Sequence, residues 1–338
     1  MNKKLRENQF TPCIGLDLLG SDADSAYILE SALPILESLQ TRAHFRLFGE
    51  EKNRETLRSI PFISYEIAPE TITMADSPLS AVRKKKNASM ILGIKALKNK
   101  QIDAFISMGN TGALITSARA NLKTLPFIKR PALLALLPSK KNKIAVLDVG
   151  ANTECKTSHL LDFAAMGLAY QKIRGIEKPT VGLLNIGTEA LKGPPLLRDT
   201  YKYLSELSKK HSYPFFLGNV EGRDVFEGHI DVLITDGFTG NVFLKTSEGI
   251  ADFLLDQLKT EPTSLAESKT LEMLQKRLTS SEHSGATLAG VDGLVIKCHG
   301  NARPKAILHS LTNAIELLEE NFLETIKAEI SSFFHPSC

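Results

Sequence analysis

The feature that most constrains the fold is a short apolar strand that ends in a glycine-bearing turn and continues into a helix. The clearest case lies in residues 230–249, where Val232–Thr235 is an apolar, β-branched run typical of a buried parallel strand. Asp236-Gly237 ends the strand, and small residues ending at Asn241 precede an apolar-periodic segment that predicts a helix. Unpaired backbone N–H groups converge at such helix starts and bind anions. Lys245 is either an added positive charge for that site or an ordinary surface lysine.

The same transition recurs along the chain, each time with glycine close to Asn, Asp, Thr or His. The loops that follow the other predicted strands are Gly20–Asp22, Met108–Ala113, Val149–Asn152, Gly187–Glu189, Gly218–Arg223 and His299–Gly300. Loops at the carboxyl ends of strands share one side of an open α/β sheet, so we expect these loops to build one site. The alternation of strand and helix predicts a parallel or mostly parallel sheet.

Residues 80–100 predict one long helix whose charged residues are all basic. They are Arg83, Lys84, Lys85, Lys86, Lys95, Lys98 and Lys100. A solvated helix normally mixes charges of both signs to form pairs one turn apart. The stretch is therefore either a lysine-rich surface helix or a landing site for a phosphate or an acidic protein.

The remaining helical patterns lie near the two ends of the chain. A helix is predicted at residues 24–39, and another at 303–330. Residues 248–284 read as a helical hairpin interrupted at Thr260–Thr263. No segment has the Pro, Gly and Ser density of a free hinge, so we expect a single domain over residues 1–338, with the hairpin as an insertion.

Composition and charge exclude several classes of protein. The net charge of +3 is too small to argue for a nucleic-acid partner, and 43% hydrophobic residues are typical of a globular chain. No apolar run approaches the ~18 residues that span a bilayer. The four cysteines have no C-x-x-C spacing and no signal peptide precedes them, so free thiols in the cytoplasm are expected.

Common catalytic motifs are also absent. The sequence has no G-x-S-x-G, H-E-x-x-H or G-x-G-x-x-G, and Leu244 replaces the second glycine of a Walker A motif. Cys298 and His299 are neighbours on a predicted strand and point to opposite faces, which argues against a Cys–His dyad. His299 has either a polar role at the strand end or a capping role. No metal and no cofactor are expected, because His and Cys lack metal-ligand spacing.

What remains is a set of polar loops suited to holding an anion. Asn110 and Thr111 offer side-chain donors, the glycines permit close backbone approach, and Lys192 and Lys245 supply positive charge. The residues alone therefore predict an α/β enzyme that handles phosphate or carboxylate groups, with phosphate as a substrate.

Taken in order, these loops resemble the PlsX family of bacterial acyl-ACP:phosphate acyltransferases, in which ACP is acyl carrier protein. The matching segments are RKKKNASM at 83–90, ISMGNTGA at 106–113, LDVGAN at 147–152, VGLLNIGTE at 181–189, GNVEGRD at 218–224 and TDGFTGNV at 235–242. Any one loop is weak evidence, but the ordered set spans nearly the whole chain.

The resemblance implies a Rossmann-like α/β/α sandwich akin to phosphate acetyltransferases and isocitrate dehydrogenases, usually a homodimer. It implies transfer of a fatty acyl group from acyl-ACP to inorganic phosphate, with the acyl phosphate passing to a glycerol-phosphate acyltransferase in phospholipid synthesis. Expected catalytic residues are Asn110, Thr111, Asp236, Asn241, Lys245 and His299. Expected substrate-binding residues are Asp17, Gly20, Arg83, Lys84, Lys85, Asn87, Gly109, Asn185, Gly187, Lys192, Asn219, Glu221, Gly237, Gly240 and Gly300.

The chain departs from the family pattern at three places. The family's D-A-M-G-G-D has Ser21 in place of its second glycine, and its H-G-S-S-D has Arg303 in place of the acid. The hairpin at 248–284 is shorter than the family's hairpin, so the resemblance supports peripheral contact with the inner face of the membrane less strongly here. The alternatives are transfer of a short acyl group from coenzyme A, a non-catalytic anion-binding protein, and a nicotinamide dehydrogenase.

Overall fold

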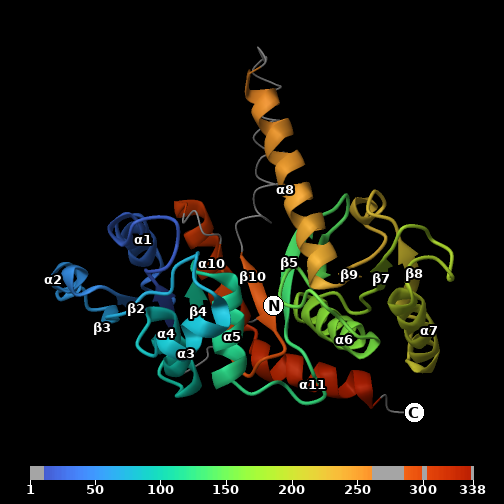
Figure 1. Ribbon diagram of the computed structural model, residues 1–338, viewed down its shortest axis with the longest axis horizontal. Helices are drawn as coiled ribbons and strands as arrows, with labels where there is room; N and C mark the ends of the chain where they lie inside the picture. The colour runs from blue at the N-terminus through green and yellow to red at the C-terminus, as the bar shows by residue number, and fades with distance from the viewer. Residues whose placement is uncertain (1–10, 261–284, 299–302, 336–338) are drawn as a thin grey trace, which may run out of the picture.

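The chain is organised around one eleven-stranded sheet (Figure 1). The computed structural model describes residues 11–260, 285–298 and 303–335. The order across the sheet is β3-β2-β1-β4-β11-β10-β5-β6-β9-β7-β8. The strands are β1 (Cys13–Asp17), β2 (His44–Gly49), β3 (Ile63–Ile67), β4 (Ala104–Ser107), β5 (Ala132–Pro138), β6 (Lys143–Leu147), β7 (Val181–Leu184), β8 (Phe216–Val220), β9 (Val232–Ile234), β10 (Ala286–Ala289) and β11 (Leu294–Lys297).

The two halves of this sheet run in opposite directions. Strand β10 is antiparallel to β11 and β5, β5 is antiparallel to β6, and the other neighbours are parallel. The expected mostly parallel α/β sheet is therefore confirmed. The expectation that all carboxyl-end loops share one side is wrong, because β1, β4 and β11 end at one edge and β6, β7, β8 and β9 end at the other. We call the side of the sheet where β4 terminates the β4 end, and the side where β6 terminates the β6 end.

A tight hairpin causes this reversal. The turn between β5 and β6 is closed by the Ser139 N–H donating to Asn142 O at 3.0 Å, and the Ser139 side chain accepts from the N–H groups of Lys141 and Asn142. Serine and asparagine favour such turns because their side chains bond to nearby backbone. The hairpin places β6 antiparallel to β5, and β9, β7 and β8 then follow the direction of β6.

Helices cover both faces of the sheet (Figure 1). Residues from α1, α6, α10 and α11 belong to the core on one face, and residues from α3, α4, α5 and α8 belong to the core on the other. The α-helices are α1 (Ser25–Leu39), α2 (Arg54–Leu57), α3 (Pro78–Lys84), α4 (Ser89–Lys98), α5 (Thr111–Asn121), α6 (Thr157–Ile173), α7 (Pro195–Lys210), α8 (Gly237–Thr260), α10 (Pro304–Glu319) and α11 (Phe322–Phe334). Two short 3₁₀ turns are η1 (Glu51–Asn53) and η2 (Val225–Glu227).

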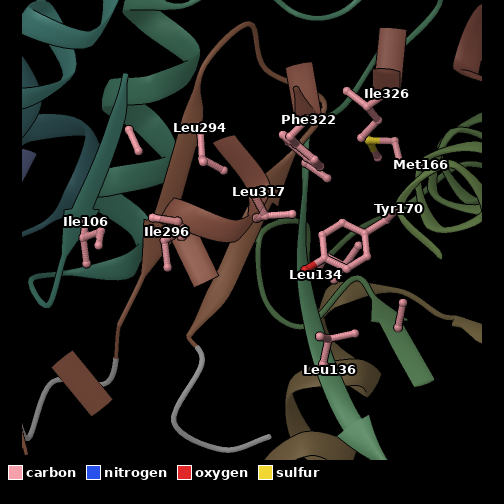
Figure 2. Close-up of a cluster of buried hydrophobic side chains, with 14 of the residues drawn as sticks. Ile106, Leu134, Leu136, Met166, Tyr170, Leu294, Ile296, Leu317, Phe322 and Ile326 are labelled. Carbon is pink, nitrogen blue, oxygen red and sulfur yellow. The ribbon is translucent and has the colours of Figure 1, made fainter. Parts of the chain in front are cut away.

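The core on the α6–α11 side joins the two halves of the chain. Figure 2 shows Leu134 of β5 and Ile296 of β11 with Tyr170 of α6 and Phe322 of α11, and the rings of the last two lie 6.0 Å apart, edge to face. Each of these side chains is at most 3% exposed. Burying a side chain of this size contributes roughly 1.5–3 kcal/mol, so this contact fixes the central strands to both helices.

The helix predicted at residues 24–39 is confirmed, and its start has a clear cause. Asp24 is the N-cap of α1, and its side chain accepts from the Ala26 N–H at 2.8 Å. Aspartate is favoured there because it satisfies a backbone donor that the first turn leaves free.

Two long helices predicted from periodicity are wrong, because each is interrupted. Residues 80–100 form α3 and α4, separated at Ala88, which pairs with Glu70 as a β-bridge and has an extended backbone. Residues 303–330 form α10 and part of α11, separated at Asn321, whose φ of 51° is left-handed. Asparagine tolerates that conformation better than most residues and often ends a helix.

Helix α8 projects from the rest of the molecule (Figure 1). It runs without a break from Gly237 to Thr260, which confirms the helix predicted after Asn241. The second part of the predicted hairpin, residues 261–284, lies outside the described residues. Among the helices of residues 11–260 and 303–335, none combines the length and apolar character that crossing a membrane requires.

Candidate functional site

A cavity of about 240 Å³ lies between the two halves of the sheet, on the face covered by α5 and α8. The floor is formed by β5 and the start of β10, one wall by the start of α5, and the opposite wall by α8, which stands beside β5 in Figure 1. The lining residues are Met74, Thr111, Leu133, Ala135, Leu136, Leu137, Val149, Asn241, Leu244, Lys245, Glu248, Gly285, Ala286, Lys297 and Cys298. Residues from both the β4 end and the β6 end of the sheet therefore contribute to one cavity.

The floor of the cavity is apolar. Leu133, Ala135 and Leu137 point to the same face of β5, because alternate residues of a strand share a face. Each is at most 7% exposed, and Leu244 of α8 belongs to the same buried cluster. This floor has the chemistry to hold a hydrocarbon chain, which gains about 0.8 kcal/mol for each methylene removed from water.

The rim of the cavity is polar and contains three of the predicted site residues. Thr111 comes from the start of α5, Asn241 and Lys245 come from successive turns of α8, and all three line this one space. The Lys245 ammonium lies 2.6 Å from a carboxylate oxygen of Glu248, one turn further along α8. The structure thus brings these three residues together, and their roles in catalysis stay predictions.

Lys297 also lines the cavity, and the sequence analysis missed it. It ends β11, where Leu294, Val295 and Ile296 are fully buried. Burial lowers the pKa of its ammonium group to about 8; Cys298, Asp17 and Asp22 raise it again in part, whereas Lys245 lowers it. The available signal was a lysine that continues an otherwise apolar buried strand, where a charge is rare.

Asp17 lies beneath the rim, 1% exposed, at the end of β1. Its carboxylate accepts from Ser107 Oγ at 2.8 Å and from the Leu19 N–H at 3.1 Å, and Ser107 Oγ accepts from the Gly109 N–H at 3.1 Å. Burial raises the pKa of Asp17 to about 6, and these hydrogen bonds, with one from Ser89, oppose the increase. Asp17 therefore shapes the loop that carries Gly109 and does not itself line the cavity.

Asn110 uses its side chain within the fold. Its amide oxygen accepts from the Ala113 N–H at 3.0 Å and caps α5, and its nitrogen lies 3.1–3.3 Å from the carbonyl oxygens of Thr73, Met74 and Asp76. An amide nitrogen has two hydrogens, so these acceptors already occupy both. In this arrangement the Asn110 side chain caps α5 and holds the 73–76 loop against Thr111, and its role in phosphate contact stays a prediction.

The turn after β1 requires one glycine but not two. Gly20 has a φ of +76°, and a Cβ there would lie 2.3 Å from Ile72 O, so a side chain is excluded. Ser21 is not among the positive-φ residues of the described chain, and its hydroxyl bonds with Ala23 N and O. The departure from the second family glycine therefore demands no unusual backbone.

The basic residues at the end of α3 have different environments. Lys85 is half-buried, lies 2.6 Å from Asp76 and donates to Thr71 O at 2.8 Å. The contact with Lys85, together with the Thr73 hydrogen bonds, lowers the pKa of Asp76 to about 2. Arg83 and Lys84 are exposed. Lys85 thus holds the 71–76 loop in place, whereas Arg83 and Lys84 face solvent. Asn87 is also exposed, and its backbone N–H donates to Glu70.

The residues predicted around residue 236 form the start of α8 at the β6 end. Asp236 accepts from the Thr239 N–H at 2.9 Å and from its hydroxyl at 2.7 Å. Gly237 donates to Asn152 O at 2.8 Å, and a Cβ on Gly240 would lie 1.9 Å from Asp148 O. These glycines therefore allow α8 to begin against the loop after β6, which places Asn241 at the cavity.

Asp148 is the centre of that loop, and it was not on the predicted site list. Its two oxygens accept from the N–H groups of Leu133, Gly150, Ala151 and Asn152 and from the Asn152 amide, at 2.7–3.1 Å. Burial raises its pKa, and these donors oppose the change. Asp148 joins β5 to the start of α8 and so supports the cavity floor.

The loops after β7 and β8 contribute nothing to the lining of the cavity. Four predicted substrate-binding residues lie there, namely Asn185, Gly187, Lys192 and Glu221, and a fifth, Asn219, lies in β8 itself. Asn185 donates to Lys192 O at 3.1 Å and Asn219 donates to Glu189 O at 2.8 Å, so both side chains hold the loop after β7. They shape loops at the β6 end, and the reversed sheet separates those loops from the β4 end.

His299 and Gly300 lie outside the described residues. Within residues 11–260, 285–298 and 303–335, no group of three or more His, Cys, Asp or Glu side chains is placed to hold a metal ion.

This fold and cavity define an α/β protein whose site pairs an apolar floor with lysines on the rim. Residues 13–325 match the family described as "Fatty acid synthesis protein". A phosphate acyltransferase of Chlamydia abortus is 40% identical over 327 residues, covering 94% of this chain and 99% of the relative. One from Thermoanaerobacter pseudethanolicus is 38% identical over 328 residues, covering 94% and 97%.

Among solved structures, a phosphotransacetylase from Streptococcus pyogenes matches with a TM-score of 0.59 at 14% identity, covering 91% of this chain and 94% of that one. This likeness shows the fold alone. The sequence matches show more: the chain belongs to the fatty acid synthesis protein family, whose phosphate acyltransferase members it resembles along nearly its full length. It is an enzyme of the acyltransferase class, as the resemblance implied.

Proposed function

We propose that this protein transfers a fatty acyl group from acyl-ACP to inorganic phosphate. The observation that carries the proposal is the cavity, in which an apolar floor on β5 meets Thr111, Asn241 and Lys245 on the rim. The names of its relatives support phosphate as the acceptor. The floor suits the fatty chain, and the rim suits an anion.

The reaction needs no covalent enzyme intermediate. A phosphate oxygen attacks the thioester carbonyl, a C–O bond forms, and the C–S bond breaks to release the carrier thiol. Catalysis then rests on holding the two reactants in contact and on donors for the developing oxyanion. In this proposal Thr111 and Lys245 contact phosphate, Asn241 contacts the thioester end, and Asn110 and Asp236 hold their loops.

The exposed end of α3 suits an acidic carrier protein. Arg83, Lys84 and Lys86 are exposed there, and none of them forms an ion pair within the described part of the chain. Met74 and Leu79, 42% and 54% exposed, lie in and after the 73–76 loop, and Met74 also lines the cavity. Basic residues next to an apolar contact at the cavity are a suitable landing site, because complementary charge speeds association.

The exposed face of α8 supports a homodimer as part of the proposal. Phe238, Val242, Ile250, Phe253 and Leu254 are each at least 51% exposed on this one helix. An apolar surface of this kind commonly marks a protein or membrane contact. Light scattering of the purified protein tests the dimer, and a monomeric mass at micromolar concentration contradicts it.

The deciding experiment measures acyl phosphate formed from long-chain acyl-ACP and inorganic phosphate, trapped with hydroxylamine, with acyl-CoA run in parallel. We expect phosphate-dependent product from acyl-ACP and a large loss of product in Lys245→Ala. Product from acyl-CoA alone points instead to a short-chain acyl-CoA:phosphate acyltransferase. No product from either donor overturns the proposal.

A further inference from the structure

The cavity contains a second lysine for which the family resemblance suggested no role. Lys297 lies on the same face of β11 as Val295, which belongs to the buried cluster on the cavity side, whereas Ile296 and Cys298 belong to the cluster on the other side. The strand therefore directs the Lys297 side chain toward α5 and α8, as its place in the cavity lining confirms.

The hydrogen bonds of Lys297 leave one donor available. Its ammonium donates to Met108 O at 3.3 Å and to its neighbour Cys298 O. An ammonium group carries three N–H donors and no acceptor. Within residues 11–260, 285–298 and 303–335, Lys297 forms no salt bridge. Its third N–H is therefore unused on the side that lines the cavity.

The surrounding charges leave this lysine without a close counter-ion. Asp17 and Asp22 attract it, Cys298 also favours its charged form, and Lys245 opposes it from the facing wall. Glu248, also on that wall, lies 2.6 Å from Lys245. A buried charge without a partner is costly, so a fold that retains one beside a cavity usually offers it to a ligand.

We propose that Lys297 binds the phosphate substrate, with its free N–H directed to a phosphate oxygen between Thr111 and Lys245. This assignment rests on the proposed use of phosphate as acyl acceptor. A phosphate there lies between Lys297 of β11 and Lys245 of α8 and relieves their repulsion. A charge-assisted hydrogen bond to phosphate is also among the stronger polar contacts that proteins make. Lys297 is thus a catalytic residue that touches the nucleophile.

A purely structural role makes a different prediction. If Lys297 only joins the ends of β4 and β11 through Met108 O, its removal lowers stability and leaves phosphate affinity unchanged. Three variants separate these cases: Lys297→Met removes the charge, Lys297→Arg keeps it, and Lys143→Met is the matched control. Lys143 is half-buried with its pKa lowered by burial, but it lies near Arg174, which follows α6, and Glu316 of α10, and both helices cover the other face of the sheet.

The experiment measures inorganic phosphate binding by titration calorimetry with full-length protein, and the Michaelis constant for phosphate in the acyl transfer assay. We expect Lys297→Met to weaken phosphate binding roughly 10- to 100-fold, as the loss of a charged hydrogen bond does. Lys297→Arg should stay within about threefold of the wild type, and Lys143→Met should not differ from it. Unchanged phosphate affinity in Lys297→Met overturns the proposal.

The pH dependence keeps the proposal testable if Lys297→Met does not fold. Because the pKa of Lys297 is lowered to about 8, the wild-type protein should lose phosphate affinity as pH rises through 8, while arginine at this position should retain it. Identical profiles contradict the proposal. Binding needs no acyl donor, so phosphate binding without product from acyl-ACP refutes only the proposed donor.

Discussion

Replacing Asp17 by asparagine should change the pH dependence of stability in a predictable direction. Asp17 is 1% exposed, and burial raises its pKa from the ordinary 3.8 to about 6. In the folded protein its proton is therefore held more tightly than in the unfolded chain. The resulting stability is fully present below about pH 4 and is lost as pH rises through about 6.

The magnitude follows from that pair of pKa values. The difference between 3.8 and about 6 corresponds to about 3 kcal/mol, which the wild-type protein loses between pH 4 and 8 relative to a neutral side chain at this position. The oxygen of an asparagine at position 17 can still accept from the Leu19 N–H. In the wild type Ser107 Oγ donates to Asp17, whereas in the variant the asparagine NH₂ group must donate to Ser107 Oγ. That rearrangement costs about 1 kcal/mol. Asp17→Asn should thus be less stable than wild type by about 1 kcal/mol at pH 4 and more stable by about 2 kcal/mol at pH 8.

Urea unfolding of both proteins at several pH values between 4 and 8 measures this difference directly. Asp199→Asn is the control, because a substitution at an exposed surface position usually changes the free energy of unfolding by no more than about 0.5 kcal/mol. A constant difference between Asp17→Asn and wild type across the range would refute the argument, because it would show that the pKa of Asp17 is the same in the folded and the unfolded protein.

Three further variants test the assignments around the cavity. Asn110→Ala should lower the free energy of unfolding by about 1–3 kcal/mol, because the helix cap and the contacts with the 73–76 loop are lost. The Michaelis constant for phosphate should change less than about threefold. A rise in that constant above about tenfold would show that Asn110 contacts the ligand directly. Ala135→Phe should fill part of the cavity and reduce kcat/KM for long-chain acyl-ACP about tenfold, equivalent to about two displaced methylenes, with phosphate binding unchanged. The double change Arg83→Glu and Lys84→Glu should raise the Michaelis constant for acyl-ACP about tenfold at low salt and less at high salt; no salt-dependent effect contradicts docking there.

Much of the local structure could be predicted from the residues. Asp24 and Asn110 cap helices, and the apolar run before Asp236 forms a strand that leads into α8, as the turn residues indicate. These features depend on neighbours in sequence, so pattern reasoning captures them. Three of the predicted site residues, Thr111, Asn241 and Lys245, line the same cavity, although the meeting of α5 and α8 there depends on the assembled sheet.

The direction of the strands could not be predicted in the same way. Central strands are buried on both faces and read as continuous apolar runs whether their neighbours are parallel or antiparallel. Strand β5 (Ala132–Pro138) is such a run, and the short turn after it reverses the sheet. Asn185 follows β7 and Asn219 lies in β8, the two outermost strands beyond β9, and neither residue lines the cavity, although the Asn185 loop resembles the one that carries Thr111.

Lys297 escaped notice because it lies in no loop motif. Only the burial of its side chain in the folded sheet distinguishes it from other lysines. That burial depends on the pairing of β4 with β11, which are almost 200 positions apart in the sequence. Similarly, the break at Ala88 depends on a bridge to Glu70, which periodicity along one helix cannot reveal.

The antiparallel centre of the sheet also links ligand binding to the folding of the entire chain. Thr111 is held by the strands on one side, Lys245 by the helix that follows the strands on the other, and the cavity between them exists only when both are assembled. A ligand that occupies the cavity binds the native state and not the unfolded chain, so at 100 times its dissociation constant it raises the free energy of unfolding by about 2.7 kcal/mol. Either half expressed alone should lack the cavity, and thermal unfolding in the presence of phosphate should shift as one transition.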